Sequence, residues 1–116
     1  MRISAVWYPV SKWQEAKHFY SEVLGLQQTH CNDEAGWVAY STSRGPPLFL
    51  VLRPERVGNQ GGAVVTFECP DLKALRKRLV LAGARVDDNI QEGAGVRILT
   101  FYDPDGNCLE ASQSIE

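Results

Sequence analysis

Hydrophobic residues recur with two different periods along the chain, and each change of period marks the start of a new element. Residues 2–8 are predicted to form a strand that Pro9 ends. From Ser11 the spacing becomes helical, and Ser11 with Gln14 forms the pattern of a capping box. Gly25 then closes this helix. Its apolar positions are Trp13, Ala16, Phe19, Tyr20, Val23 and Leu24.

Three strands are predicted after this helix, at residues 26–31, 37–42 and 48–52. Turn-forming residues separate them at 32–36 and 43–47. The first half of the chain therefore reads as strand, helix and three strands.

The same order returns after residues 54–62, a linker rich in turn formers. A strand at 63–69 ends before Pro70, Asp71 is the expected N-cap of a second helix, and Gly83 closes that helix. The apolar stripe of the helix is Leu72, Leu75, Leu79 and Ala82. The elements expected next are a strand at 85–90, a turn at 91–95, and strands at 96–102 and 107–112.

The repeated order indicates an internal duplication. Module one covers residues 1–53 and module two residues 63–116, and each is too small to bury a core alone. We therefore expect one domain over residues 1–116, of the α+β class.

The composition and charge of the chain argue against nucleic acid as a partner and against a membrane-spanning segment. A net charge of −2 over 116 residues argues against nucleic acid, and no apolar run is long enough to span a membrane. Cys31, Cys69 and Cys108 follow no metal or redox spacing, which is typical of reduced thiols in a cytoplasmic protein.

The most informative segment is the turn Asp103-Pro104-Asp105-Gly106, followed by a strand that carries the lone carboxylate Glu110. This segment, from Tyr102 to Asn107 with Leu109-Glu110, resembles the vicinal oxygen chelate superfamily. The stretch Phe19-Tyr20 followed by Val23-Leu24-Gly25-Leu26 matches the same family in the first half. Its members include glyoxalase I, extradiol dioxygenases, fosfomycin-resistance enzymes and bleomycin-resistance proteins.

This resemblance implies two βαβββ modules whose sheets curl into an open cleft. Family enzymes hold a divalent metal there, with His, Glu or Gln ligands from the first and last strand of each module. The corresponding positions here are Ala5, the apolar strand 48–52, Ala63 or Val64, and Glu110. Because only Glu110 has a donor atom, we expect no metal or other cofactor, and a protein that is more a binder than an enzyme.

The predicted function is therefore metal-free binding of a planar or aromatic small molecule, with drug sequestration as one form of it. A homodimer is expected, formed with or without exchange of modules. The predicted ligand-binding residues are Trp7, Trp37, Tyr40, Arg97, Tyr102, Cys108 and Glu110.

Two alternatives remain open at this point. One is a metal-dependent lyase, isomerase or dioxygenase with an unusual ligand set that includes Glu110. The other is an interaction protein whose cleft is filled by its own side chains. Glu110 itself either pairs with Arg97 on the neighbouring strand or lies in a wet cleft.

Overall fold

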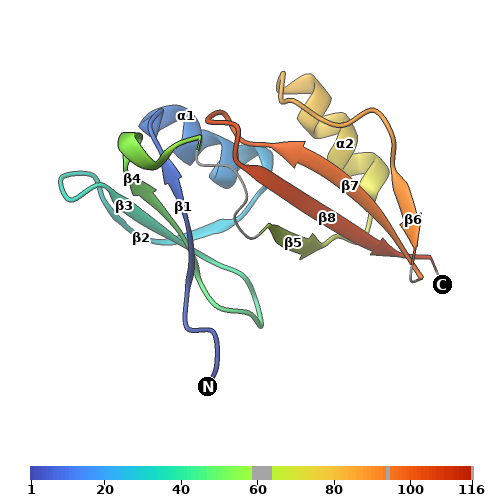
Figure 1. The fold of residues 1–116 in the computed structure, drawn as a ribbon, viewed down its shortest axis with the longest axis horizontal. Helices are drawn as coiled ribbons and strands as arrows, with labels where there is room; N and C mark the ends of the chain where they lie inside the picture. Colours follow the sequence, from blue (N-terminus) through green and yellow to red (C-terminus); the bar gives the residue numbers. More distant parts are fainter. Residues whose placement is uncertain (59–63, 94, 116) are drawn as a thin grey trace. The chain divides into compact units, whose positions relative to one another are not determined.

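The computed structural model describes residues 1–58, 64–93 and 95–115 (Figure 1). The chain divides into two compact units, Met1–Asn59 and Gln60–Glu116, and the boundary falls inside the predicted linker. Each unit contains one four-stranded sheet and one main helix. This is the α+β arrangement that the sequence predicts, and each unit is described by itself below.

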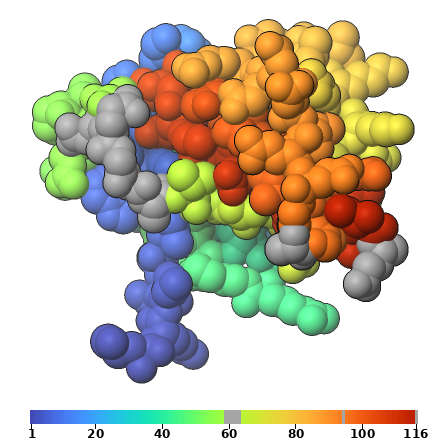
Figure 2. Space-filling model, turned by 45° about the vertical axis from the view of Figure 1, so that its right-hand side comes forward, coloured from blue at the N-terminus to red at the C-terminus, as the bar shows by residue number. Residues whose placement is uncertain are grey.

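The first unit has the sheet order β1-β4-β3-β2, with β1 parallel to β4 and the other pairs antiparallel. Its elements are β1 (Val6–Val10), α1 (Trp13–His18), a π-helical turn η1 (Phe19–Val23), β2 (Gln27–Asn32), β3 (Trp37–Ser41), β4 (Leu48–Leu52) and a short 3₁₀ turn η2 (Pro54–Arg56). The residues before β1 are extended and exposed, and they appear in dark blue in Figure 2.

The core of this unit lies between one face of the sheet and the helix. Tyr40 is fully buried there and stacks on Tyr20, with the ring centroids 6.0 Å apart. The Tyr40 hydroxyl accepts a hydrogen bond from Ser21 Oγ at 3.1 Å and donates to the Lys17 carbonyl at 3.4 Å. The other buried residues on this side are Tyr8, Val10, Ala16, Phe19, Val23, Val38, Leu48 and Leu50.

Two predictions about the first unit are wrong at its first strand and helix. Pro9 lies inside β1, opposite Val51, which is tolerated because β1 is at the edge of its sheet. Val10 is held extended by the Arg53 amide, which donates to its carbonyl at 3.0 Å. The helix therefore starts later than predicted, with Lys12 at the N-cap position and without a side-chain capping bond. Ser11, predicted as the N-cap, lies one position before it.

The second unit has the corresponding sheet order β5-β8-β7-β6, with β5 parallel to β8. Its elements are β5 (Val65–Glu68), α2 (Leu72–Leu81), β6 (Gln91–Gly93), β7 (Val96–Tyr102) and β8 (Cys108–Ser114). Asp71 caps α2 as predicted, since its carboxylate accepts from the Ala74 amide at 3.1 Å. No described helix of the chain is both long and apolar enough to cross a membrane.

The core of the second unit lies between α2 and one face of this sheet. The Leu72 amide donates to the Gln113 side chain at 2.8 Å, which ties the start of α2 to β8. The buried apolar residues are Leu72, Leu75, Leu79, Leu99, Phe101, Leu109 and Ala111. Ala82, predicted in the apolar stripe, is instead exposed at the helix C-cap. The outer side of α2 is exposed, with its residues in yellow in Figure 2.

The segment between α2 and β7 also differs from its prediction. Residues 85–90 do not form a full strand, because only Val86 makes a bridge, to Phe101. The turn formers Asp87 and Asp88 follow at once. Gln91–Gly93, predicted as part of a turn, instead pairs with β7 as strand β6.

The two units repeat the same register. Val6 and Val65 begin their first strands at the same distance before the helices, and they pair with Leu48 and Leu109. The next pair along is Trp7 with Phe49 in the first unit and Thr66 with Glu110 in the second. These two pairs are therefore structurally equivalent, which supports the internal duplication.

Candidate functional site

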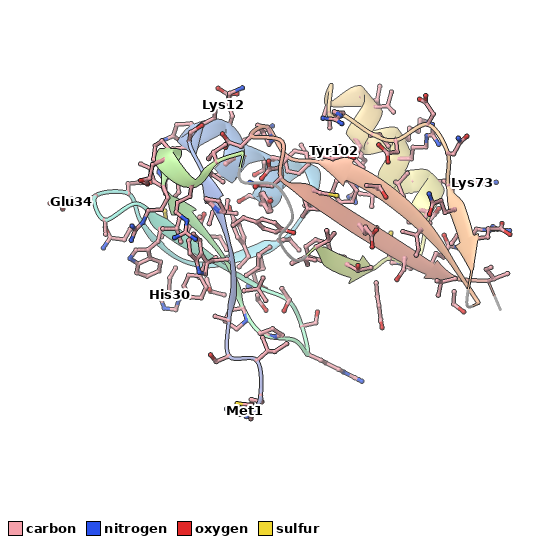
Figure 3. All side chains as sticks on the ribbon, in the orientation of Figure 1. Met1, Lys12, His30, Glu34, Lys73 and Tyr102 are labelled. Atoms are coloured by element: carbon pink, nitrogen blue, oxygen red, sulfur yellow. The ribbon has the colours of Figure 1, made fainter. Side chains whose placement is uncertain are left out.

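Each sheet has a second face, opposite its helix, which we call the open face. In the first unit this open face is apolar over β1, β4 and most of β3, and we call this part the aromatic face, while β2 contributes polar residues. Alternation and register place on it Trp7, Pro9, Trp37, Ala39, Phe49 and Val51. His30 lies opposite Ala39 in the register, and Figure 3 shows it on the side of the sheet away from α1.

Aromatic rings on this face are accessible. Trp7 is 44% exposed, and the Arg56 guanidinium lies 5.6 Å from the centre of its ring. Trp37 and Phe49 are half-buried, with ring centroids 6.0 Å apart. Flat apolar surfaces of this kind bind other planar groups by stacking and by burial of apolar area.

The third tryptophan of the chain belongs to a different group. Trp13 Nε1 donates to Asp33 at 2.8 Å, and Lys17 Nζ lies 2.6 Å from the same carboxylate. The hydrogen bond from Lys17, followed by that from Trp13, lowers the pKa of Asp33 to about 2. This group, which we call the Asp33 clasp, ties the β2–β3 turn to α1, so its role is structural.

In the second unit the open face is polar, and we call it the polar face. Register places on it Thr66, Glu68, Thr100, Tyr102, Cys108, Glu110, Ser112 and Ser114, together with the apolar Val96 and Ile98 at one end. The carboxylate of Glu110 is half-buried and accepts a hydrogen bond from the Thr66 hydroxyl at 2.9 Å. Cys108 and Glu110 share this face, as strand alternation predicts.

Of the two alternatives for Glu110, the pairing with Arg97 is not observed. Arg97 lies opposite Gln113 in the register, on the side of the sheet that faces α2. Its guanidinium bonds Glu92 at 2.9 Å, across the β6–β7 pair. Because neighbouring positions of a strand point to opposite faces, Arg97 and Glu110 do not share one site.

Tyr102 and Cys108 are opposite one another at one end of the polar face, and Tyr102 is labelled in Figure 3. The Arg85 guanidinium lies 3.9 Å from the centre of the Tyr102 ring. Desolvation, followed by the charge of Asp87, raises the pKa of Tyr102. Desolvation, followed by the charge of Glu110, raises the pKa of the Cys108 thiol. Cys108 is therefore a neutral thiol at neutral pH and a poor nucleophile.

The predicted site residues thus fall into three groups. Trp7 and Trp37 lie on the aromatic face, and Tyr102, Cys108 and Glu110 lie on the polar face. Arg97 lies on neither face. Tyr40 is a fully buried core residue, whose ring stacks on Tyr20 and whose hydroxyl accepts a hydrogen bond from Ser21. This does not agree with its predicted role in ligand binding.

Sequence reasoning missed four residues of these faces: Phe49, Arg56, Thr66 and Arg85. Strand alternation assigns Thr66 to a face, but its contact with Glu110 depends on the pairing of β5 with β8. Arg85 was predicted to begin a strand, but its place beside Tyr102 depends on the single bridge from Val86 to Phe101.

A family model matches residues 2–111, and its description is the Glyoxalase/Bleomycin resistance protein/Dioxygenase superfamily. The match covers nearly the whole chain. The chain belongs to this superfamily. A search of curated proteins found no match.

Solved structures agree with this superfamily assignment. An antibiotic-binding protein, TnmS3 from Streptomyces sp. CB03234, is 26% identical, with a TM-score of 0.78 over 98% of this chain and 96% of that one. A glyoxalase/dioxygenase from Nostoc punctiforme is 18% identical, with a TM-score of 0.82 over 99% and 92%. The fosfomycin resistance protein FosX from Listeria monocytogenes is 12% identical, with a TM-score of 0.81 over 98% and 93%. The last two show the fold alone.

The metal that the superfamily implies does not fit the residues at its expected positions. Ala5 and Val64 have no donor atom, and Phe49 is the register equivalent of Glu110 in the first unit. Ala63, the other predicted position, lies outside the described residues. Within residues 1–58, 64–93 and 95–115, no group of three or more His, Cys, Asp or Glu side chains is placed to hold a metal ion. We therefore derive no metal-dependent step for this chain.

Proposed function

We propose that this protein binds a planar small molecule without a metal ion, with its aromatic face as the main contact surface. The observation that carries the proposal is the aromatic face itself, where Trp7 is 44% exposed beside Phe49 and Trp37. An exposed tryptophan on a regular sheet contributes little to the fold and offers a large apolar surface to a ligand. The likeness to an antibiotic-binding protein supports an antibiotic as the class of ligand.

Calorimetric titration in a buffer with a chelator tests this proposal. The probes are bleomycin and the planar, cationic anthracycline doxorubicin, with fosfomycin as a small control without an aromatic ring. We expect micromolar binding of at least one aromatic probe and none of fosfomycin. If neither aromatic probe binds at 100 μM protein, the proposed function is wrong.

Variants locate the binding surface. Trp7→Ala and Trp37→Ala should each weaken binding at least about tenfold, which corresponds to about 1.4 kcal/mol. Trp13→Phe is the matched control, because Trp13 belongs to the Asp33 clasp and not to the aromatic face. Equal effects of all three substitutions would indicate a loss of folding and would argue against the aromatic face.

The absence of a metal is part of the proposal and has its own test. The same titrations are repeated after addition of nickel, zinc, manganese or iron(II). Unchanged affinities support metal-free binding. A requirement for one of these ions, lost in Glu110→Gln, would instead favour a metal-dependent enzyme that uses this carboxylate.

We also infer a homodimer located in the cytoplasm. The exposed apolar side chain of Trp7 in the first unit supports a self-association surface. Sedimentation velocity at micromolar protein concentration measures the oligomeric state. A single monomeric species at 100 μM would contradict the dimer.

A further inference from the structure

Besides the carboxylates of Glu68 and Asp87, the polar face of the second unit carries a cation, Arg85, and an anion, Glu110, and each of these two is held by a neutral partner. Glu110 accepts a hydrogen bond from the Thr66 hydroxyl at 2.9 Å. The Arg85 guanidinium lies 3.9 Å from the centre of the Tyr102 ring. Among the described residues, the ion pairs within 4 Å are Lys17–Asp33 and Arg97–Glu92, so neither Glu110 nor Arg85 has an ionic partner.

Backbone hydrogen bonds place Arg85 on this face. The Tyr102 amide donates to the Arg85 carbonyl at 3.0 Å, and the Asp87 amide donates to the Thr100 carbonyl at 2.9 Å. Val86, between them, bridges to Phe101, which faces the core. Because neighbouring positions alternate, Arg85 and Asp87 lie on the polar face, beside Tyr102 and Thr100.

Two of the groups near Arg85 and Glu110 are uncharged, and the third, the Asp87 carboxylate, accepts a hydrogen bond from the Tyr102 hydroxyl. Thr100 is uncharged, and the Cys108 thiol stays neutral because burial, followed by the charge of Glu110, raises its pKa. Asp87 shares a hydrogen bond with the Tyr102 hydroxyl, which contributes to the raised pKa of Tyr102. Arg85 therefore keeps its guanidinium N–H donors, and Glu110 keeps one carboxylate oxygen, for a ligand.

We propose that the polar face binds small zwitterions, with Arg85 pairing with the anionic group and Glu110 with the ammonium group. An arginine that stacks on a ring is pre-oriented to bind a carboxylate or phosphate with two parallel hydrogen bonds. This inference rests on the proposed binding function, and it adds the charge pattern that the ligand carries.

The spacing of the two residues sets the length of the ligand. With strands about 4.8 Å apart and a rise of about 3.4 Å per residue, the Cα atoms of Arg85 and Glu110 are roughly 12 Å apart. Stacking over Tyr102 brings the guanidinium closer to Glu110. The face therefore selects zwitterions whose charges are separated by several methylene groups, and it excludes α-amino acids.

The test is a titration of the ¹⁵N-labelled full chain with 6-aminohexanoate, followed by ¹H–¹⁵N NMR. Three matched probes accompany it: hexanoate carries only the anion, hexylamine carries only the cation, and glycine carries both charges too close together. We expect saturable shifts of amides in β7 and β8 with 6-aminohexanoate, and at least fivefold weaker binding of each control probe.

Variants assign the two charges. Glu110→Gln and Arg85→Gln should each weaken binding of 6-aminohexanoate at least fivefold. Arg97→Gln is the matched control, since Arg97 lies on the opposite face and should leave the affinity unchanged. The NMR spectra of the variants also report whether each one is folded.

The outcomes separate this inference from the proposed function. No saturable shifts up to 50 mM 6-aminohexanoate, while doxorubicin still binds, would overturn the zwitterion site and leave the proposed function standing. Equal binding of hexanoate and 6-aminohexanoate, or no effect of Glu110→Gln, would also overturn it. Binding of 6-aminohexanoate without binding of any aromatic probe would support the polar face and refute the aromatic one.

Discussion

The open faces of the two sheets occupy equivalent positions and carry opposite chemistry. Where the first unit pairs Trp7 with Phe49, the second pairs Thr66 with Glu110. The core positions on either side of these pairs are apolar in both units, as at Leu48 and Leu109. The comparison teaches that the two units share their register and apolar core positions, while their open faces differ.

The largest predicted effect tests whether the two cores are equivalent. Leu48→Ala and Leu109→Ala remove the same side chain from equivalent buried positions, so each should lower the free energy of unfolding by about 2–5 kcal/mol. Urea unfolding followed by circular dichroism measures both values. A cost below 1 kcal/mol for one variant only would show that the two cores are not equivalent.

The next prediction exchanges the chemistry of the open faces. Phe49→Glu places a carboxylate on the half-buried aromatic face, and it should cost about 1–3 kcal/mol of stability. Adding Trp7→Thr supplies a hydroxyl at the position equivalent to Thr66, which donates to Glu110 in the second unit. The double variant should therefore be about 0.5–1 kcal/mol more stable than the sum of the two single substitutions predicts.

A double-mutant cycle by urea unfolding gives this coupling energy. Thr66→Val with Glu110→Gln provides the reference cycle in the second unit. A coupling of zero in the first unit would show that register alone does not recreate the polar pair.

A smaller effect comes from the helix caps, which differ between the units. Asp71→Ala removes the carboxylate that accepts from the Ala74 amide, and it should cost about 1 kcal/mol. Lys12→Ala is the control, since Lys12 occupies the N-cap of α1 without a side-chain capping bond, and it should cost less. Thermal unfolding that gives the same Tm for both variants would contradict the assignment of the caps.

The smallest effect concerns the Asp33 clasp of the first unit. The pKa of Asp33 is lowered to about 2, so its ionised form stabilises the fold above the ordinary carboxyl range. This stabilisation is lost as the pH falls from about 4 through about 2. Asp33→Asn should therefore lower the Tm slightly at pH 6 and hardly at all at pH 2. An equal decrease at both pH values would argue against the ionic role of Asp33.

Much of the fold could be predicted from local patterns. The strands Leu48–Leu52 and Val96–Tyr102 were predicted with their observed bounds, because runs of apolar and alternating residues mark them clearly. The start of helix α1, in contrast, depends on contacts with residues that are distant in the sequence. Ser11 has the right sequence for a cap, but pairing of Val10 with Leu52 moves the start of the helix beyond it.

The candidate site was less predictable because its contacts cross between strands. Alternation correctly puts Cys108 and Glu110 on one face, but it gives no register, so Arg97 was placed beside Glu110 when it lies on the opposite side. The place of Arg85 beside Tyr102 could not be predicted, since a single bridge at Val86 determines its orientation. The local sequence pattern predicts which residues share one face of a strand. Which residues of neighbouring strands come into contact depends on how the strands pair.

The π-helical turn η1 has an evolutionary consequence. Gly25 lies one position further from the start of α1 than Gly83 lies from the start of α2, so the first unit accommodates a one-residue insertion within this turn. Tyr40, whose hydroxyl bonds the Lys17 carbonyl and the Ser21 side chain beside the turn, is the register equivalent of Phe101. Because the Tyr40 hydroxyl bonds groups beside this turn, we expect the extra residue and the hydroxyl to be gained or lost together in related sequences.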